Sequence, residues 1–185
     1  MKFFKIIFIT FIFLTCSVKA DLNQNLIKEF QQGGKLIFIR HAYAPGSGDP
    51  KNFNLNDCST QRNLNDSGRE QSKIIGYLFS TYNIEIEKVY SSEWCRCKET
   101  AAIAFGRFET IKFLNSFYSP EFAKNRKIQI REFQEFINNW NKKDNLIFVT
   151  HYVFISEILN YAPSSGEIVI TDKNLNIVDT LEIEH

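Results

Sequence analysis

Short apolar runs alternate with longer amphipathic stretches along most of this chain. Residues 36–39 form a run of four apolar side chains, rich in aromatic and β-branched residues, that stops at Arg40 and His41. A second run of the same kind, residues 146–149, leads to Thr150 and His151. Such short runs are typical of buried strands. We therefore expect two buried strands that each lead to a histidine, at the carboxyl edge where open α/β sheets bind their ligands.

The amphipathic stretches predict the helices. A helix capped by Asn65 or Asp66 is expected to run to about Tyr82, with apolar side chains on one face. Residues 94–105 and 153–159 are also expected to be helical, and a shorter amphipathic segment, residues 21–34, precedes the first strand. Residues 120–140 are expected to form one long amphipathic helix, with the inward side chains Ile128, Ile130, Phe133, Phe136 and Ile137.

Three more strands complete the expected sheet. They lie in residues 84–92, 167–171 and 176–181, and the last two flank a turn at residues 172–174. Strands that alternate with helices predict an α/β fold, a three-layer sandwich whose mostly parallel central sheet is flanked by helices and has an antiparallel edge. Because no repeat or low-complexity linker interrupts this order, residues 21–185 are expected to form a single domain.

The first twenty residues have a different pattern. Two lysines precede an apolar run, residues 6–14, and the segment ends in the small residue Ala20. This order is typical of a secretory signal peptide cleaved after Ala20, and the run is short for a transmembrane helix. We therefore expect a periplasmic or secreted protein, with retention of residues 1–20 as an anchor as the alternative.

Composition and charge narrow the classes of partner. The hydrophobic fraction is 44% and Phe occurs 18 times, as in a globular protein. The full chain has a net charge of +1, and loss of the three lysines in residues 1–20 leaves 19 basic residues (22 less 3) against 21 acidic ones, a net charge of −2. We therefore expect no nucleic-acid partner and, after cleavage, no stable membrane association. The sequence carries no prediction of the oligomeric state.

Cysteines that remain after cleavage predict a disulfide, because an exported protein meets an oxidising compartment. Cys58 is expected to pair with Cys95 or with Cys97, leaving one thiol free. Either pairing would hold the backbone around Arg96, which lies between the last two cysteines. No histidine near them completes a metal site, so no metal is expected.

Four separated motifs resemble the histidine phosphatase superfamily, which has the phosphoglycerate-mutase-like fold, and they extend from about residue 35 toward the end of the chain. Arg40-His41-Ala42 is similar to that family's Arg-His-Gly, with alanine in place of glycine. Residues 64–71, LNDSGREQ, are similar to its Leu-Thr-x-x-Gly-x-x-Gln helix start. Residues 91–101, SSEWCRCKETA, are similar to its Ser-Ser-x-x-x-Arg-x-x-x-Thr-Ala, and Val149-Thr150-His151 to the strand of its second histidine.

This resemblance implies an exported phosphatase of the histidine acid type, a phosphoric monoester hydrolase that needs no cofactor. His41 would attack the phosphorus of a small phosphorylated substrate and form a phosphohistidine, which water then hydrolyses. Arg40, Arg96 and His151 would bind the phosphate and stabilise its charge in the transition state, because guanidinium forks match phosphate oxygens. Positive charge around His41 also opposes its protonation and keeps it nucleophilic.

Other residues are candidates for supporting roles. Glu121 lies at a family-like offset after the second arginine and is the candidate proton donor to the leaving group, with helix capping as the alternative. Glu99 is a rival, but an ion pair near its own helix is expected for it. Asp49 and Asn63 are candidates to bind substrate at the mouth of the pocket, although both residue types also form turns. Arg62 is expected to be exposed, with a further cation in the pocket as the alternative.

Two other functions fit the same motifs. One is a phosphotransferase or mutase, which export disfavours because it separates the protein from glycolytic intermediates. The other is a catalytically silent module that binds a phosphorylated ligand, which an intact set of Arg40, His41, Arg96 and His151 disfavours. Tyr152 stands where the larger acid-phosphatase branch carries an aspartate, so membership of that branch is not expected. The sequence leaves the identity of the phosphomonoester open.

Overall fold

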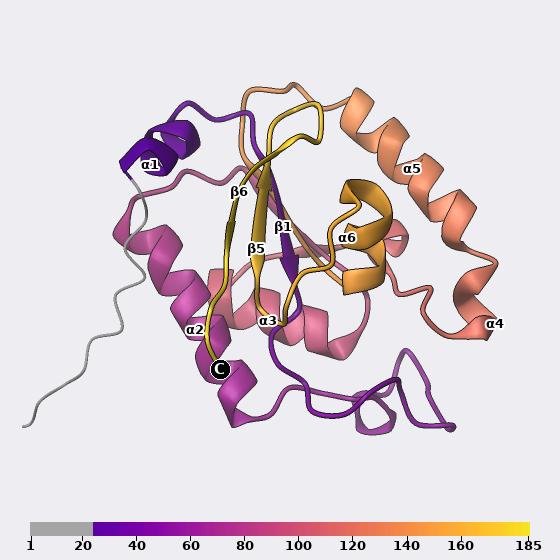
Figure 1. Cartoon of the computed structure of the whole chain (residues 1–185). Coiled ribbons are helices and arrows are strands. Elements are labelled where there is room, and N and C mark those ends of the chain that lie inside the picture. Colours follow the sequence, from indigo (N-terminus) through magenta and orange to yellow (C-terminus); the bar gives the residue numbers. More distant parts are fainter. Residues whose placement is uncertain (1–23) are drawn as a thin grey trace, which may run out of the picture.

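A six-stranded sheet lies between two layers of helices in the computed structural model, which describes residues 24–185 (Figure 1). Its order is β3-β2-β4-β1-β5-β6. The strands from β3 to β1 are parallel to one another, whereas β5 pairs antiparallel with β1 and β6 antiparallel with β5. This arrangement confirms the predicted α/β fold with its antiparallel edge. The strands are β1 (Leu36–Arg40), β2 (Lys88–Ser91), β3 (Glu109–Thr110), β4 (Leu146–Thr150), β5 (Ile168–Thr171) and β6 (Ile177–Leu181).

The helices cover both faces of the sheet because successive strand residues point to opposite sides. Ile37 and Ile39 of β1 pack against α1, α2 and α3 on one face. Leu36 and Phe38 pack against α5 and α6 on the other face. Figure 1 shows these helices around the sheet. The helices are α1 (Gln24–Gln31), α2 (Asp66–Thr81), α3 (Cys95–Phe105), α4 (Pro120–Ala123), α5 (Arg126–Asn138) and α6 (Tyr152–Leu159), with the 3₁₀ turns η1 (Cys58–Thr60) and η2 (Lys112–Leu114) between them.

The single helix predicted for residues 120–140 is wrong, because the structure has two helices there, α4 and α5. Ile128 was expected to face the core but is 49% exposed. Five residues at about 100° each place it about 140° around α5 from the fully buried Phe133. Gln129 faces inward instead, and its side-chain amide donates hydrogen bonds to backbone carbonyls of η2 and the residue after it. The remaining three inward candidates pack, partly buried, against the cluster of Phe133.

The predicted disulfide is present and resolves the choice of partner. Cys58 is bonded to Cys95, with their Cα atoms 5.7 Å apart, and Cys97 is a free, buried thiol. Among residues 24–185, no helix is both long enough and apolar enough to cross a membrane. The predicted signal peptide, residues 1–20, lies outside the described residues.

Candidate active site

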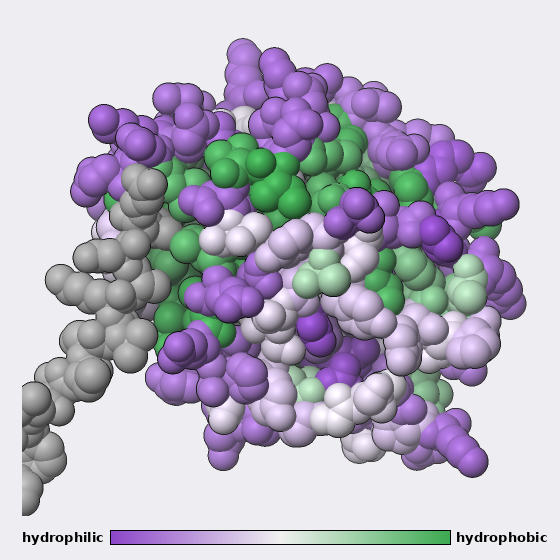
Figure 2. All heavy atoms as spheres, in the orientation of Figure 1, coloured by the Kyte–Doolittle hydropathy of each residue, from purple (hydrophilic) through white to green (hydrophobic). Residues whose placement is uncertain are grey.

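The carboxyl ends of β1 and β4 bring the two predicted histidines together. Arg40 pairs with Thr150 in the parallel register, so His41 and His151, one residue further along each chain segment, become neighbours. Their ring centroids are 5.5 Å apart. Arg96 joins them from the first turn of α3, the helix that follows β2. Figure 2 shows a hydrophilic hollow in the lower half of the face of the molecule that is turned to the viewer, where Figure 1 places the end of β1.

These side chains line a cavity of about 140 Å³. Its walls come from the strand ends, from the loop after β1, from the segment before α2 and from the stretch that leads into α4. Three guanidinium groups and two imidazoles face one small space, which is the composition that a phosphate dianion requires. The lining residues are Arg40, His41, Gly46, Ser47, Gly48, Asp49, Arg62, Trp94, Arg96, Ser116, Tyr118, Ser119, Phe122, His151 and Tyr152.

Residues of the sequence motifs that carry no charge hold the loop after His41 in place. The Ala42 N–H donates to Thr100 Oγ1 at 3.0 Å, and the Tyr43 N–H donates to Gln71 Oε1 at 2.8 Å. Gly68 lies so close to this loop that a Cβ atom there would be 2.0 Å from the Tyr43 carbonyl oxygen. The motif spacing therefore reflects how α2 and α3 dock against the segment that carries His41.

His41 is buried in its neutral form with one ring nitrogen free. Its Nδ1 lies 2.8 Å from the Ala42 carbonyl oxygen. A carbonyl only accepts hydrogen bonds, so Nδ1 carries the hydrogen and the lone pair is on Nε2. Burial, followed by the charges of Arg96, Arg62 and Arg40, lowers the pKa of His41 well below its usual value. This is the protonation state that a nucleophilic histidine needs.

His151 is also neutral in this structure. Its Nδ1 is 3.5 Å from the Arg96 Nη2, which can only donate, and its Nε2 is 2.9 Å from Ser92 Oγ. The hydrogen therefore lies on Nε2 and is donated to the serine hydroxyl. Burial, followed by the charge of Arg96, lowers the pKa of His151 well below its usual value. His151 thus contributes a polar ring rather than a positive charge to the cavity.

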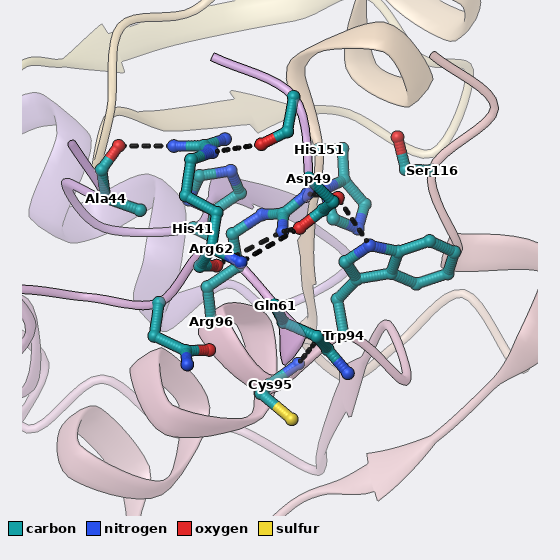
Figure 3. A network of polar contacts seen from close by, with 12 residues as sticks. His41, Ala44, Asp49, Gln61, Arg62, Trp94, Cys95, Arg96, Ser116 and His151 are labelled. Atoms are coloured by element: carbon teal, nitrogen blue, oxygen red, sulfur yellow. Dashed lines mark hydrogen bonds and ion pairs between the residues drawn. The ribbon is translucent and has the colours of Figure 1, made fainter. Parts of the chain in front are cut away.

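Arg96 and Asp49, both expected to bind substrate, are bonded to each other (Figure 3). The Arg96 Nη1 and Nη2 donate to the two carboxylate oxygens of Asp49 at 2.8 and 3.3 Å. Nη1 is also 3.3 Å from the Arg62 carbonyl oxygen. With the contact to His151, both Nη groups are fully engaged by acceptors of this chain, and only the buried Nε of Arg96 has no partner in the described residues. The fork expected to hold phosphate already holds a carboxylate.

Arg40 and Arg62 supply the other two guanidinium groups. The Arg40 Nη1 donates to the Pro163 carbonyl oxygen at 2.8 Å, its guanidinium carbon lies 5.3 Å from the centre of the Tyr152 ring, and its buried Nε has no partner in residues 24–185. Arg62 donates to the carbonyls of Ala44 and Gly48. The prediction that Arg62 is exposed is wrong, because Arg62 is half-buried and lines the cavity. Its position agrees with the alternative prediction of a further cation in the pocket.

Two sequence candidates lie away from the cavity lining. Glu121 is exposed in the first turn of α4, and its neighbour Phe122 lines the cavity instead. The Asn63 side-chain amide donates to the Cys58 carbonyl oxygen at 2.6 Å and so supports the loop around the disulfide. Their expected contacts with substrate stay predictions. Glu99 forms an ion pair with Arg69 at 2.7 Å, as expected.

Residues 24–185 contain no cluster of three or more His, Cys, Asp or Glu side chains placed to hold a metal ion. The buried guanidinium nitrogens without a protein partner are instead suited to an anion. A phosphate in the cavity would give such donors the acceptors that they lack.

No family model matches this sequence, and no curated protein matches it. Solved structures do match the fold. The protein histidine phosphatase SixA complexed with tungstate has a TM-score of 0.55 and 14% identity, over 80% of this chain and 96% of that chain. The alpha-ribazole phosphatase from Shigella flexneri has a TM-score of 0.56 and 14% identity, over 75% and 90%. TTHB049 from Thermus thermophilus has a TM-score of 0.58 and 12% identity, over 81% and 99%.

These structures define the class of the fold. Their similarity extends over three quarters or more of this chain and nearly the whole of each neighbour. The chain therefore has the phosphoglycerate-mutase-like fold, as the four sequence motifs predict.

Proposed function

We propose that this protein is an exported phosphatase that hydrolyses a phosphomonoester through a phosphohistidine at His41. The observation that carries the proposal is a neutral His41 with a free Nε2, held in one cavity with Arg40, Arg62 and Arg96. Two proteins with this fold support the proposal of phosphatase activity. SixA is called a protein histidine phosphatase, and the Shigella flexneri protein is called an alpha-ribazole phosphatase.

The reaction proceeds in two displacements. His41 Nε2 attacks phosphorus, the bond to the leaving oxygen breaks, and that oxygen takes up a proton. The Ala42 carbonyl, which already accepts the Nδ1 hydrogen, stabilises the positive charge that the ring gains on bonding to phosphorus. Guanidinium N–H groups stabilise the charge on the equatorial oxygens. Water then attacks phosphorus from the side opposite His41 Nε2, where the leaving group was. The P–N bond breaks, and phosphate and neutral His41 are released.

Export is part of the proposal. It is supported by the signal-like pattern of residues 1–20 and by the Cys58–Cys95 disulfide, since stable disulfides are typical of oxidising compartments. The mature chain would then begin at Asp21 and act in the periplasm or outside the cell. The cavity of about 140 Å³ is large enough for a phosphoryl group, and a small phosphorylated compound is the substrate that we propose.

The nucleophile is tested by trapping the intermediate. Mature protein mixed with a phosphorus-labelled aryl phosphate and quenched should carry label that is acid-labile and base-stable, on a peptide that contains His41. His41→Ala should lose label and turnover while its circular dichroism is unchanged, and His185→Ala, which removes an exposed imidazole outside the cavity, should keep both. Turnover near the wild-type rate in folded His41→Ala would exclude the mechanism. Transfer of the label to an added alcohol rather than to water would favour a phosphotransferase.

A further inference from the structure

Asp49 carries the only carboxylate among the described residues that line the cavity. It lies on the loop after β1, between the Arg96 guanidinium and the Trp94 indole (Figure 3). Its oxygens accept hydrogen bonds from the Arg62 N–H at 3.1 Å, from Trp94 Nε1 at 3.1 Å and from both Nη groups of Arg96. Asp49 is therefore an acidic side chain that accepts four hydrogen bonds inside a cavity whose other charged side chains suit a bound anion.

A bound phosphate and this carboxylate compete for the same donors. Both Nη groups of Arg96 are already engaged, so a phosphate that uses the fork has to displace the oxygens of Asp49. A dianion attracts the guanidinium more strongly than a carboxylate with one charge does, and the two anions repel each other at this range. The adjoining residues 45–47 are exposed, so the carboxylate can turn away from Arg96 without opening the core.

Displacement changes what Asp49 can do. While it is paired with Arg96, burial alone would raise its pKa, but the hydrogen bonds and charge of Arg96 outweigh burial and keep the pKa below its usual value. After displacement the guanidinium faces the phosphate instead, and a dianion lies beside the largely buried carboxylate. Both changes favour the protonated acid. The other charged or titratable groups around the cavity are Arg40, Arg62, His41, His151, Tyr118 and Tyr152.

We propose that Asp49 donates the proton to the leaving group, and that it acquires this proton when the substrate's phosphate replaces it on Arg96. The proposal rests on the function proposed above. A monoanionic substrate transfers its own proton to Asp49 and binds as the dianion, since the second ionisation of a phosphomonoester lies near pH 6. When His41 attacks and the P–O bond breaks, Asp49 gives that proton to the leaving oxygen, which departs as a neutral alcohol.

The same carboxylate then completes the cycle. It accepts a proton from the water that attacks the phosphohistidine, so the hydroxide bonds to phosphorus as the P–N bond breaks. Release of phosphate returns the proton to the product or to solvent, and Asp49 pairs again with Arg96. Each proton taken up is given back, and no further reactant is needed.

Substrates with different leaving groups test the donor. An alkyl phosphate such as glycerol 2-phosphate leaves as a strong base and needs the proton, whereas 4-nitrophenyl phosphate leaves as a stabilised phenolate and needs it far less. Asp49→Asn keeps the size of the side chain and one acceptor oxygen but cannot donate a carboxyl proton. We expect kcat for glycerol 2-phosphate to fall by roughly 10²–10⁴-fold, with 4-nitrophenyl phosphate hydrolysis retained within several-fold.

A control variant, a rival variant and a pH profile make the result specific. Asp57→Asn changes an exposed acid in the segment that follows the same loop and is the control, which should retain hydrolysis of both substrates. Glu121→Gln tests the rival donor named from the sequence, and it should not show the selective loss if Asp49 is the donor. Asp49→Glu should recover part of the glycerol 2-phosphate activity. The wild-type kcat for glycerol 2-phosphate should fall on the alkaline side as the bound-state acid ionises, and Asp49→Asn should lack that limb.

The outcomes separate the alternatives. Equal losses on both substrates in folded Asp49→Asn would overturn the proposal and make Asp49 a positioning residue for Arg96. No loss on either substrate would also overturn it, and a selective loss in Glu121→Gln would assign the donor to Glu121. A wild-type protein that hydrolyses neither substrate would overturn the proposed function itself, whereas wild-type turnover with an unselective Asp49→Asn would overturn only the donor.

Discussion

Acidification from pH 7.5 to 5 is expected to lower the free energy of unfolding of this protein by up to about 4 kcal/mol, because two histidines are buried without charge. His41 and His151 are 3% and 2% exposed. Burial first, and then the charge of Arg96, lowers the pKa of both well below the usual value for histidine. In the unfolded chain the two histidines are neither buried nor held beside Arg96, and both side chains take up protons as the pH falls.

The magnitude follows from this difference in proton binding. A histidine with an unfolded pKa of about 6.5 that stays neutral when folded destabilises the folded state by roughly 2 kcal/mol at pH 5, so the pair gives about 4 kcal/mol. The contribution of the two neutral histidines to the free energy of unfolding is fully present well above pH 6.5. It is lost as the pH falls toward the pKa values of His41 and His151 in the folded protein. The expected loss is a large part of the roughly 5–15 kcal/mol that stabilises a typical domain.

Urea denaturation at pH 7.5, 6.5, 5.75 and 5 measures this slope. His41→Gln and His151→Gln should each show about half of the wild-type dependence on pH, whereas His185→Gln, which changes an exposed residue at the end of the chain, should keep all of it. Carboxylates with lowered pKa, such as Asp49 and Asp172, add a loss in the same direction only at lower pH. A wild-type slope in both His41→Gln and His151→Gln would refute the reasoning.

Three further predictions concern the binding of phosphate by Arg96, the disulfide and export. Arg96→Lys should reduce kcat/KM for 4-nitrophenyl phosphate by the equivalent of about 2–4 kcal/mol, because an ammonium cannot form two parallel hydrogen bonds, and a rate within a few-fold of wild type would place Arg96 outside the phosphate site. The Cys58–Cys95 bond closes a loop over a sequence separation of 37, so reduction should lower the free energy of unfolding by about 4 kcal/mol, measured by urea denaturation with and without reductant; a Cys58→Ser/Cys95→Ser control should not respond to reductant. Mass spectrometry of the exported protein should find Asp21 at the amino terminus, and retained residues 1–20 would favour an anchor instead.

Local pattern was sufficient for the elements that position His41 and His151. Buried parallel strands are covered by helices on both faces, so they are apolar at every position and appear in the sequence as short runs such as residues 36–39. Each run ends where the chain leaves the sheet, and the polar residues at that point mark the site. The order of strands and helices then restricts the fold to a few arrangements. For these reasons the sequence alone determined the three-layer fold and the identity of the two histidines.

Amphipathic pattern was less reliable where a helix is broken. Residues 120–140 satisfy a helical period as a whole, but the interruption between α4 and α5 changes which positions face the core. Ile128 is exposed and Gln129 is buried because unpaired carbonyls near η2 need a donor there. The two-residue strand β3 is too short to show any period. These features depend on neighbours that are distant in the sequence.

Only the tertiary structure decided the pairings within the site. Cys95 and Cys97 are equivalent in the sequence, but two residues on a helix point about 200° apart, so one faces Cys58 and the other the core. Asp49 and Arg96 are separated by 47 residues, and nothing in their local sequence shows that the carboxylate occupies the guanidinium fork. Such contacts arise when loops from different strand ends meet, because their geometry is set by how the whole sheet and its helices pack.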